Sequence, residues 1–250
     1  MENNFNLNEL IQREIFFPID FSDCIQKDYG IFFYNEDNPL SWDSNHAVIT
    51  NLGTDLDHTF REILDFYLMK KIKPRIYASM QPDELSVLAP YFVQYHFQLA
   101  YKNMNQYFIW RNQPASFHLE GITFQRCYEL TEELMDIIFS DDDGGEWTIK
   151  VLQRHLQHPS FHLLVGYADT QPVCMASLKL MDGYSRVDDV ITHLTHRGKG
   201  YGRALMYYLV DYHNSISDNF LYLYASNPVA IKNYKLCGFE DLDFKFDDWQ

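Results

Sequence analysis

Residues 188–203 read DDVITHLTHRGKGYGR and are followed by ALMYYLVDYHNSI at 204–216. The β-branched residues of 188–194 predict a strand, and the apolar spacing after the glycines predicts a helix. Between them, residues 197–203 combine glycines with three cationic side chains. A strand that enters a helix through such a turn directs backbone N–H groups, the helix dipole and positive charge at one point. We therefore predict a phosphate-binding turn, and the rest of the chain is interpreted around it.

The composition is that of a folded, acidic protein. The chain has 250 residues, of which 46% are hydrophobic, enough for one large domain or two smaller ones. Its formal net charge is −15, which argues against nonspecific binding to nucleic acid or to an anionic membrane. An acidic surface favours a cationic substrate, although it also aids solubility. The basic cluster at 197–203 is more informative because positive charge is scarce elsewhere.

Nothing in the sequence indicates a metal site, a disulfide framework or a membrane segment. The four cysteines are widely spaced, with no C-x-x-C pair, as in a protein of the reducing cytoplasm. The acidic run DDDGGE at 141–146 lacks the alternating spacing of a calcium loop. The N-terminus has no basic segment before an apolar run, and no apolar stretch is long enough to span a bilayer. We therefore expect a cytoplasmic protein without metal.

The pattern of predicted elements breaks near 112–120, which suggests domains at 1–118 and 119–250. In the second half, one strand and two helices precede three strands, after which helices and strands alternate. In the first half, strands near 47–51, 76–78 and 107–110 alternate with helices. The last strands and helices of the second half follow the same order. The first-half turn lacks the basic glycine-rich signature, so we interpret this half as a degenerate copy. The predicted class is α/β with mixed sheets.

Two common phosphate loops do not fit the turn. In G-x-G-x-x-G, the third glycine would fall at Leu205, and in G-x-x-x-x-G-K-[ST] the first glycine would fall at His193. The pattern present is R-x-x-G-x-G, formed by Arg197, Gly200 and Gly202. Glycines without a Cβ atom allow the backbone to approach a pyrophosphate closely.

This pattern, followed by NPVAIKNYKLCGF at 227–239, resembles the GCN5-related N-acetyltransferase (GNAT) family. The resemblance covers roughly 121–246, and it departs at Leu194, where the family often has proline. It implies a catalytic GNAT domain at 119–250, with acetyl-CoA as co-substrate. A tandem GNAT-like fold, with a degenerate GNAT-like domain at 1–118, is also known in the family.

The resemblance also implies a cofactor site. The pyrophosphate would accept hydrogen bonds from the turn, the strand end would contact the pantetheine arm, and the residue that caps the next helix would touch the same arm. The predicted cofactor-binding residues are Ile191, Thr192, Arg197, Gly198, Lys199, Gly200, Tyr201, Gly202, Arg203 and Asn227.

Tyr234 is the candidate general acid, which would protonate the departing CoA thiolate. Asp188, Asp189 and His193 are the bases available to accept a proton from an amine. Adjacent strand residues face opposite ways, so the two aspartates are not expected to line the cleft together. We prefer Asp189, and removal of the proton by water stays an alternative.

The acceptor is not readable from the sequence. A small-molecule amine or a peptide amine fits the resemblance, and the first half could serve as a lid, a homodimer surface or a wall of the acceptor site. Two other functions stay open: a non-catalytic acyl-CoA sensor or interaction module, and a nucleotide-binding protein outside this family.

Overall fold

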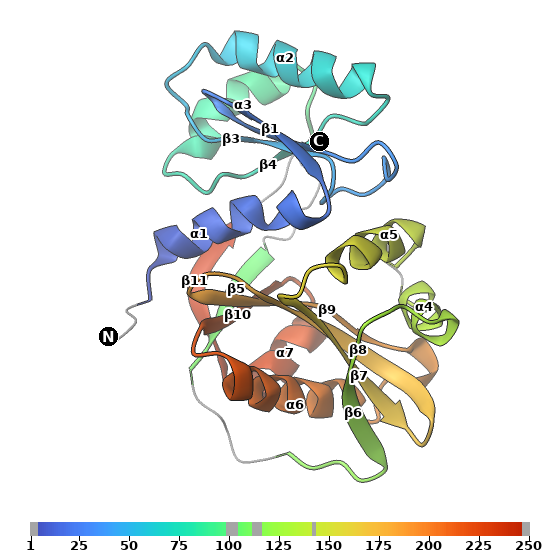
Figure 1. The fold of residues 1–250 in the computed structure, drawn as a ribbon. Coiled ribbons are helices and arrows are strands. Elements are labelled where there is room, and N and C mark those ends of the chain that lie inside the picture. Colours follow the sequence, from blue (N-terminus) through green and yellow to red (C-terminus); the bar gives the residue numbers. More distant parts are fainter. Residues whose placement is uncertain (1–4, 99–104, 112–116, 142–143, 247–250) are drawn as a thin grey trace. The chain divides into compact units, whose positions relative to one another are not determined.

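The computed structural model describes residues 5–98, 105–111, 117–141 and 144–246, which form two compact units. We call Asn6–Asn105 the N-terminal unit and Gln106–Phe244 the C-terminal unit. Both combine helices with a mixed sheet, which confirms the predicted fold class (Figure 1). Within the described ranges, no helix is both long and apolar enough to cross a membrane.

The N-terminal unit contains a four-stranded sheet in the order β1-β2-β3-β4. The strands β1, β2 and β3 pair in antiparallel fashion, whereas β3 and β4 are parallel. Phe32, Phe60 and Tyr67 belong to the buried core between this sheet and its helices. The elements are α1 (Leu7–Phe16), a 3-10 helix (Phe17–Asp20), β1 (Asp23–Lys27), β2 (Gly30–Tyr34), β3 (His46–Ile49), α2 (Leu56–Met69), β4 (Ile76–Tyr77) and α3 (Glu84–Gln94).

The C-terminal unit contains a seven-stranded sheet in the order β11-β5-β10-β9-β8-β7-β6. The order of elements predicted for the second half of the chain is confirmed. The elements are β5 (Asn105–Trp110), β6 (Ile122–Cys127), α4 (Glu132–Phe139), α5 (Glu146–His155), β7 (Phe161–Ala168), β8 (Gln171–Leu180), β9 (Tyr184–Thr192), a 3-10 helix (Leu194–His196), α6 (Tyr201–Ile216), β10 (Phe220–Ala225), α7 (Pro228–Leu236) and β11 (Phe239–Phe246).

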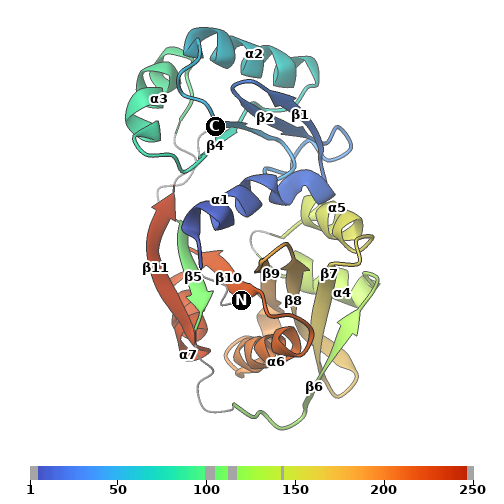
Figure 2. The ribbon, with the colours of Figure 1, turned by 60° about the vertical axis from the view of Figure 1, so that its left-hand side comes forward.

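Helices cover both faces of the large sheet (Figure 2). Alternate residues of β8 belong to different cores: Cys174 and Ala176 pack with α6 and α7, whereas Met175 packs with α4 and α5. This alternation follows from the two-residue period of a strand. We call the two sides of the sheet the α6 face and the α4 face.

Two irregularities of β9 shape the middle of this sheet. Its parallel pairing with β10 runs only from Tyr184↔Phe220 to Arg186↔Tyr222. On the β8 side, Ser177 pairs with Asp188 and Met175 pairs with Ile191, so one residue of β8 faces two residues of β9. Such a bulge bends a strand and changes the direction of its side chains. The strand β9 therefore diverges from β10 and turns over its last residues.

The strand β5 changes the predicted division of the chain. We assigned residues 107–110 to a first domain that ends at residue 118. In the structure, Tyr107 and Ile109 pair with β10 of the large sheet, so residues from Gln106 onward join the C-terminal unit. The pairing of β5 is a long-range contact, which local sequence patterns do not encode.

The two units share a topology. In each, three antiparallel strands lead into a helix, a fourth strand parallel to the third, and a second helix. The equivalent helices, α2 and α6, begin differently. Asp55 caps α2, where its side chain accepts a hydrogen bond from the backbone N–H of His58, but Gly200 leaves α6 without a side-chain cap. A carboxylate therefore occupies the start of α2, while the start of α6 is open to another anion.

We predict that Asp55→Ala lowers the free energy of unfolding by about 1 kcal/mol, because loss of an N-cap leaves helix N–H groups without an acceptor. Urea denaturation would measure this change. The exposed Asp65 of the same helix provides the control, since Asp65→Ala is expected to change stability by at most about 0.5 kcal/mol. Equal effects of the two substitutions would contradict a stabilising cap.

Candidate functional site

The glycine-rich turn adopts backbone angles that require glycine. Gly198 and Gly200 have φ angles of 79° and 87°, in the left-handed region. A Cβ atom on Gly202 would lie 2.9 Å from Thr192 Oγ1, so this glycine allows α6 to begin against the end of β9. The turn therefore holds the first N–H groups of α6 next to the strand end.

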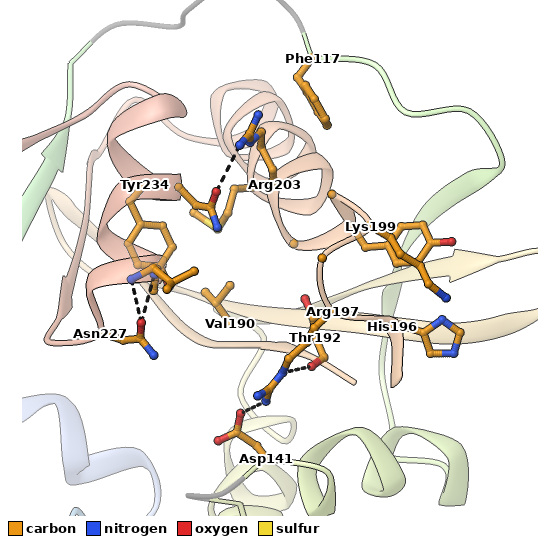
Figure 3. Close-up of a pocket in the computed structure, with 18 residues that line it drawn as sticks. Phe117, Asp141, Val190, Thr192, His196, Arg197, Lys199, Arg203, Asn227 and Tyr234 are labelled. Atoms are coloured by element: carbon orange, nitrogen blue, oxygen red, sulfur yellow. Dashed lines mark hydrogen bonds and ion pairs between the residues drawn. The ribbon is translucent and has the colours of Figure 1, made fainter. Parts of the chain in front are cut away.

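A cavity of about 770 Å³ opens over this turn (Figure 3). It extends from the end of β9 across the start of α6 to α7, and Tyr234 is part of its lining. The structure thus brings the candidate acid to the same cavity as the turn. The predicted cofactor-binding residues in the lining are Thr192, Arg197, Gly198, Lys199, Gly200, Tyr201, Gly202, Arg203 and Asn227.

Ile191 and Asp189 lie outside this lining. Ile191 packs with the core on the α4 face, one position before Thr192, which lines the cavity. Strand alternation explains this difference. The side chain of Ile191 therefore does not contribute to the cavity.

The expectation that Asp188 and Asp189 face opposite ways is wrong, because the bulge interrupts the alternation at this place. Asp188 pairs with Ser177, so its side chain shares the face of that serine. The Ser177 hydroxyl also donates a hydrogen bond of 2.6 Å to Asp189 Oδ2, and Asp189 has a left-handed φ of 50°. Val187 and Leu178 belong to the core on the α6 face, so both carboxylates point to the α4 face.

Both carboxylates have hydrogen-bonding partners. Arg186 Nη2 lies 2.7 Å from Asp188 Oδ2 and forms an ion pair with it. Asp189 accepts the hydrogen bond from the Ser177 hydroxyl. The carboxylate of Asp188 is therefore already engaged with a cation.

Tyr234 is almost fully buried and packs against Phe239. Burial raises the pKa of its phenol above the usual value of 10, and the negative charge of Asp188 raises it further. Tyr234 therefore remains protonated at neutral pH. Asn227 caps α7 as predicted, since its Oδ1 accepts hydrogen bonds from the N–H groups of Val229 and Ala230 at 2.9 and 3.4 Å.

Arg197 joins three segments of the chain. Its Nε donates to the carbonyl of Thr192 at 3.1 Å, and its Nη2 lies 2.7 Å from Asp141 Oδ2, in the loop after α4. The same loop accepts a hydrogen bond from the backbone N–H of Leu194 through Ser140 Oγ. Arg197 thus fixes the turn against the α4 loop while its guanidinium remains in the cavity lining (Figure 3).

His193 has a structural position, because its Nε2 lies 3.2 Å from Asp136 Oδ2 of α4. The acidic run forms no metal site within the described residues, and residues 142–143 of that run lie outside them. Asp141 instead pairs with the basic turn.

Eight residues of the lining were not predicted to belong to the site, and Phe117, Asp141 and Asn233 are three of them. Phe117 precedes the predicted second domain and belongs to no motif. Asp141 lies in the acidic run that lacks calcium-loop spacing, and Asn233 lies inside the α7 motif without a predicted role. Only Asn233 carried a usable signal, since it is one residue before Tyr234. The other two reach the cavity through tertiary contacts.

The fold and this geometry agree with comparisons to known proteins. Residues 124–239 match the model of the acetyltransferase (GNAT) family. Residues 124–239 form a GNAT domain. A sequence comparison with curated proteins found no significant match.

Solved structures extend the similarity over both units. A GCN5-related N-acetyltransferase from Kribbella flavida is 14% identical and has a TM-score of 0.73, over 97% of this chain and 93% of that chain. A second, from Sphaerobacter thermophilus, is 10% identical with a TM-score of 0.58, over 92% and 82%. A tandem GNAT protein from the clavulanic acid biosynthesis pathway is 11% identical with a TM-score of 0.56, over 82% and 74%. At these identities the comparison shows the fold alone, and that fold includes tandem GNAT arrangements.

We predict that Asp141→Asn raises the affinity for inorganic pyrophosphate by about 1.4- to fivefold, because Asp141 competes with an incoming anion for Arg197. An exposed ion pair contributes about 0.2–1 kcal/mol, which sets this range. Isothermal titration calorimetry at low salt would measure it.

Asp136→Asn is the matched control, because Asp136 also pairs with a basic residue beside the turn but does not line the cavity. A weaker affinity of the Asp141→Asn variant would contradict competition and would mean that Asp141 orients Arg197 for the anion.

Proposed function

We propose that the C-terminal unit transfers an acetyl group from acetyl-CoA to a primary amine, by direct attack in a ternary complex. The GNAT family and fold support acyl transfer in general. The observation that supports acetyl transfer from acetyl-CoA to an amine is one cavity. It joins an uncapped helix start, a diverging strand end and a buried tyrosine.

The residues of the turn fit a diphosphate. The start of α6 has no side-chain cap, so its first N–H groups are available to phosphate oxygens. Lys199 and Arg203 line the cavity and would add charge-assisted hydrogen bonds. Val190 and Thr192, on the part of β9 that has left β10, would flank the pantetheine arm.

Bound acetyl-CoA would supply the acetyl group as a reactive thioester. The reaction would form a C–N bond and break the C–S bond, with one proton leaving the amine and one arriving at sulfur. Tyr234 would donate the proton to sulfur. The burial that raises the pKa of this phenol would also raise the pKa of a thiol beside it. The two pKa values would therefore shift in the same direction, which keeps proton transfer from the phenol to sulfur near equilibrium.

Asp189 is the proposed base for the amine. It lies at the bulge where β9 diverges, and it accepts a hydrogen bond from the Ser177 hydroxyl. Asp188 shares the α4 face but is ion-paired with Arg186. An amine that enters from the α4 face would therefore meet carboxylates before the thioester, which agrees with a cationic acceptor and an acidic chain.

Turnover tests the function directly. The purified full chain would be incubated with acetyl-CoA and a panel of small amines and amino-terminal peptides, and thiol release would be followed. We expect release above the rate without amine for at least one acceptor class. Tight CoA binding without turnover on any amine would favour the non-catalytic sensor, and absence of CoA binding would overturn both functions.

We predict that Tyr234→Phe lowers kcat about 10²-fold with little change in the Kd for CoA, because it removes a proton donor and leaves the ring in place. Tyr128→Phe, at an exposed tyrosine of the same unit, is the control. Since the pKa of Tyr234 is raised, kcat of the native enzyme is not expected to fall through loss of this proton below about pH 10. Unchanged kcat in the variant would exclude Tyr234 as the acid.

We predict that Asp189→Asn lowers kcat/KM for the amine about 10²-fold and flattens the acidic limb of its pH profile, with CoA affinity preserved. Asp188→Asn provides the comparison on the same face. If Asp188→Asn alone flattens that limb, Asp188 is the base. If neither substitution does, water removes the proton.

A further inference from the structure

The segment before β6 contributes an aromatic ring to the cavity. Phe117 lines the cavity although it lies outside the GNAT-matched residues 124–239. Its ring centroid is 5.7 Å from that of Tyr207, and the guanidinium of Arg203 lies 5.3 Å from it. A Cβ atom built on Gly200 would be 3.6 Å from Phe117 Cζ. The ring therefore covers the first turns of α6.

The N-cap residue of α6 and two residues of the helix lie beneath Phe117. Gly200, Arg203 and Tyr207 are spaced by three and four positions, so they share a face of the helix. Phe117 belongs to none of the buried core clusters of the described residues and is only half-buried. Packing of the core does not account for an aromatic ring at this place.

The guanidinium of Arg203 is not fully hydrogen-bonded within the described residues. Its Nε is buried and has no partner among the described residues, and its Nη2 reaches Asn233 Oδ1 only at 3.5 Å. A guanidinium presents several donors in a plane, which suits phosphate, and an aromatic face suits a flat base. Figure 3 shows Phe117 and Arg203 together, on the other side of the drawn residues from Asp141.

We propose that Phe117 and Arg203 form a subsite for the nucleotide end of the acyl donor, in which the adenine stacks on Phe117 and a ribose phosphate binds Arg203. This inference rests on the proposed function and specifies its donor. The site would select free acyl-CoA over an acyl group carried on the phosphopantetheine of a carrier protein, because that donor has no adenosine.

The test compares Phe117→Ala with the native full chain for two ligands, CoA and 4′-phosphopantetheine, by calorimetry. We expect the affinity for CoA to fall about tenfold, the scale of one lost base–aromatic stack, and the affinity for 4′-phosphopantetheine to change less than about twofold. Phe117→Trp should retain the affinity for CoA, since it keeps an aromatic face. Adenosine 3′,5′-bisphosphate should lose affinity for Phe117→Ala in the same proportion as CoA.

Tyr128→Ala is the matched control. Tyr128 also stacks on an arginine, with the guanidinium of Arg126 4.8 Å from its ring, but it lies outside the cavity. Its removal should change neither affinity, and thermal unfolding of each variant would show that the fold is retained.

Equal losses for both ligands, or unchanged CoA affinity in Phe117→Ala, would overturn the subsite and leave the acetyltransferase proposal standing. Failure of the native chain to bind CoA would overturn both, and that result is visible before any substitution is made.

Discussion

The divergence of β9 from β10 is the constraint on which the functional geometry depends. Two parallel strands normally continue their ladder of hydrogen bonds, but here the pairing ends at Arg186 and Tyr222. The bulge at Asp189, three residues farther along the strand, bends β9. As a result, Thr192 reaches the glycine turn, and the cavity extends along the end of β9. On its other edge, β10 is held by β5, so the opening does not leave β10 unsupported.

The two units begin the equivalent helices of one shared topology in different ways. Both place a helix directly after the third antiparallel strand. In the C-terminal unit, glycine at the cap exposes the positive end of α6. In the N-terminal unit, Asp55 supplies its own carboxylate to α2, and Tyr91 and Tyr95 stack on Phe60 of the same helix. The carboxylate of Asp55 therefore occupies the place at the start of α2 that a phosphate would take at the start of α6.

Basic and acidic side chains near the end of β9 lie on opposite faces of the large sheet. The basic residues of the turn lie around the cavity on the α6 face, whereas Asp188 and Asp189 point to the α4 face. An anionic donor and a cationic acceptor would thus approach from opposite faces and meet where β9 and β10 separate. Arg197 also connects the two sides, because it touches both the strand end and the loop after α4.

The sequence by itself determined the order of the elements in the second half of the chain, the glycine turn, the cap at Asn227 and the place of Tyr234 in the cavity lining. These features are local, since backbone preference, capping and apolar spacing act over a few residues. Only the tertiary structure decided the direction of Asp189, the strand partner of β5 and the entry of Phe117 and Asp141 into the cavity. Each depends on which distant segment pairs or packs at that point, and a one-residue change of register at the bulge reverses the face of a side chain.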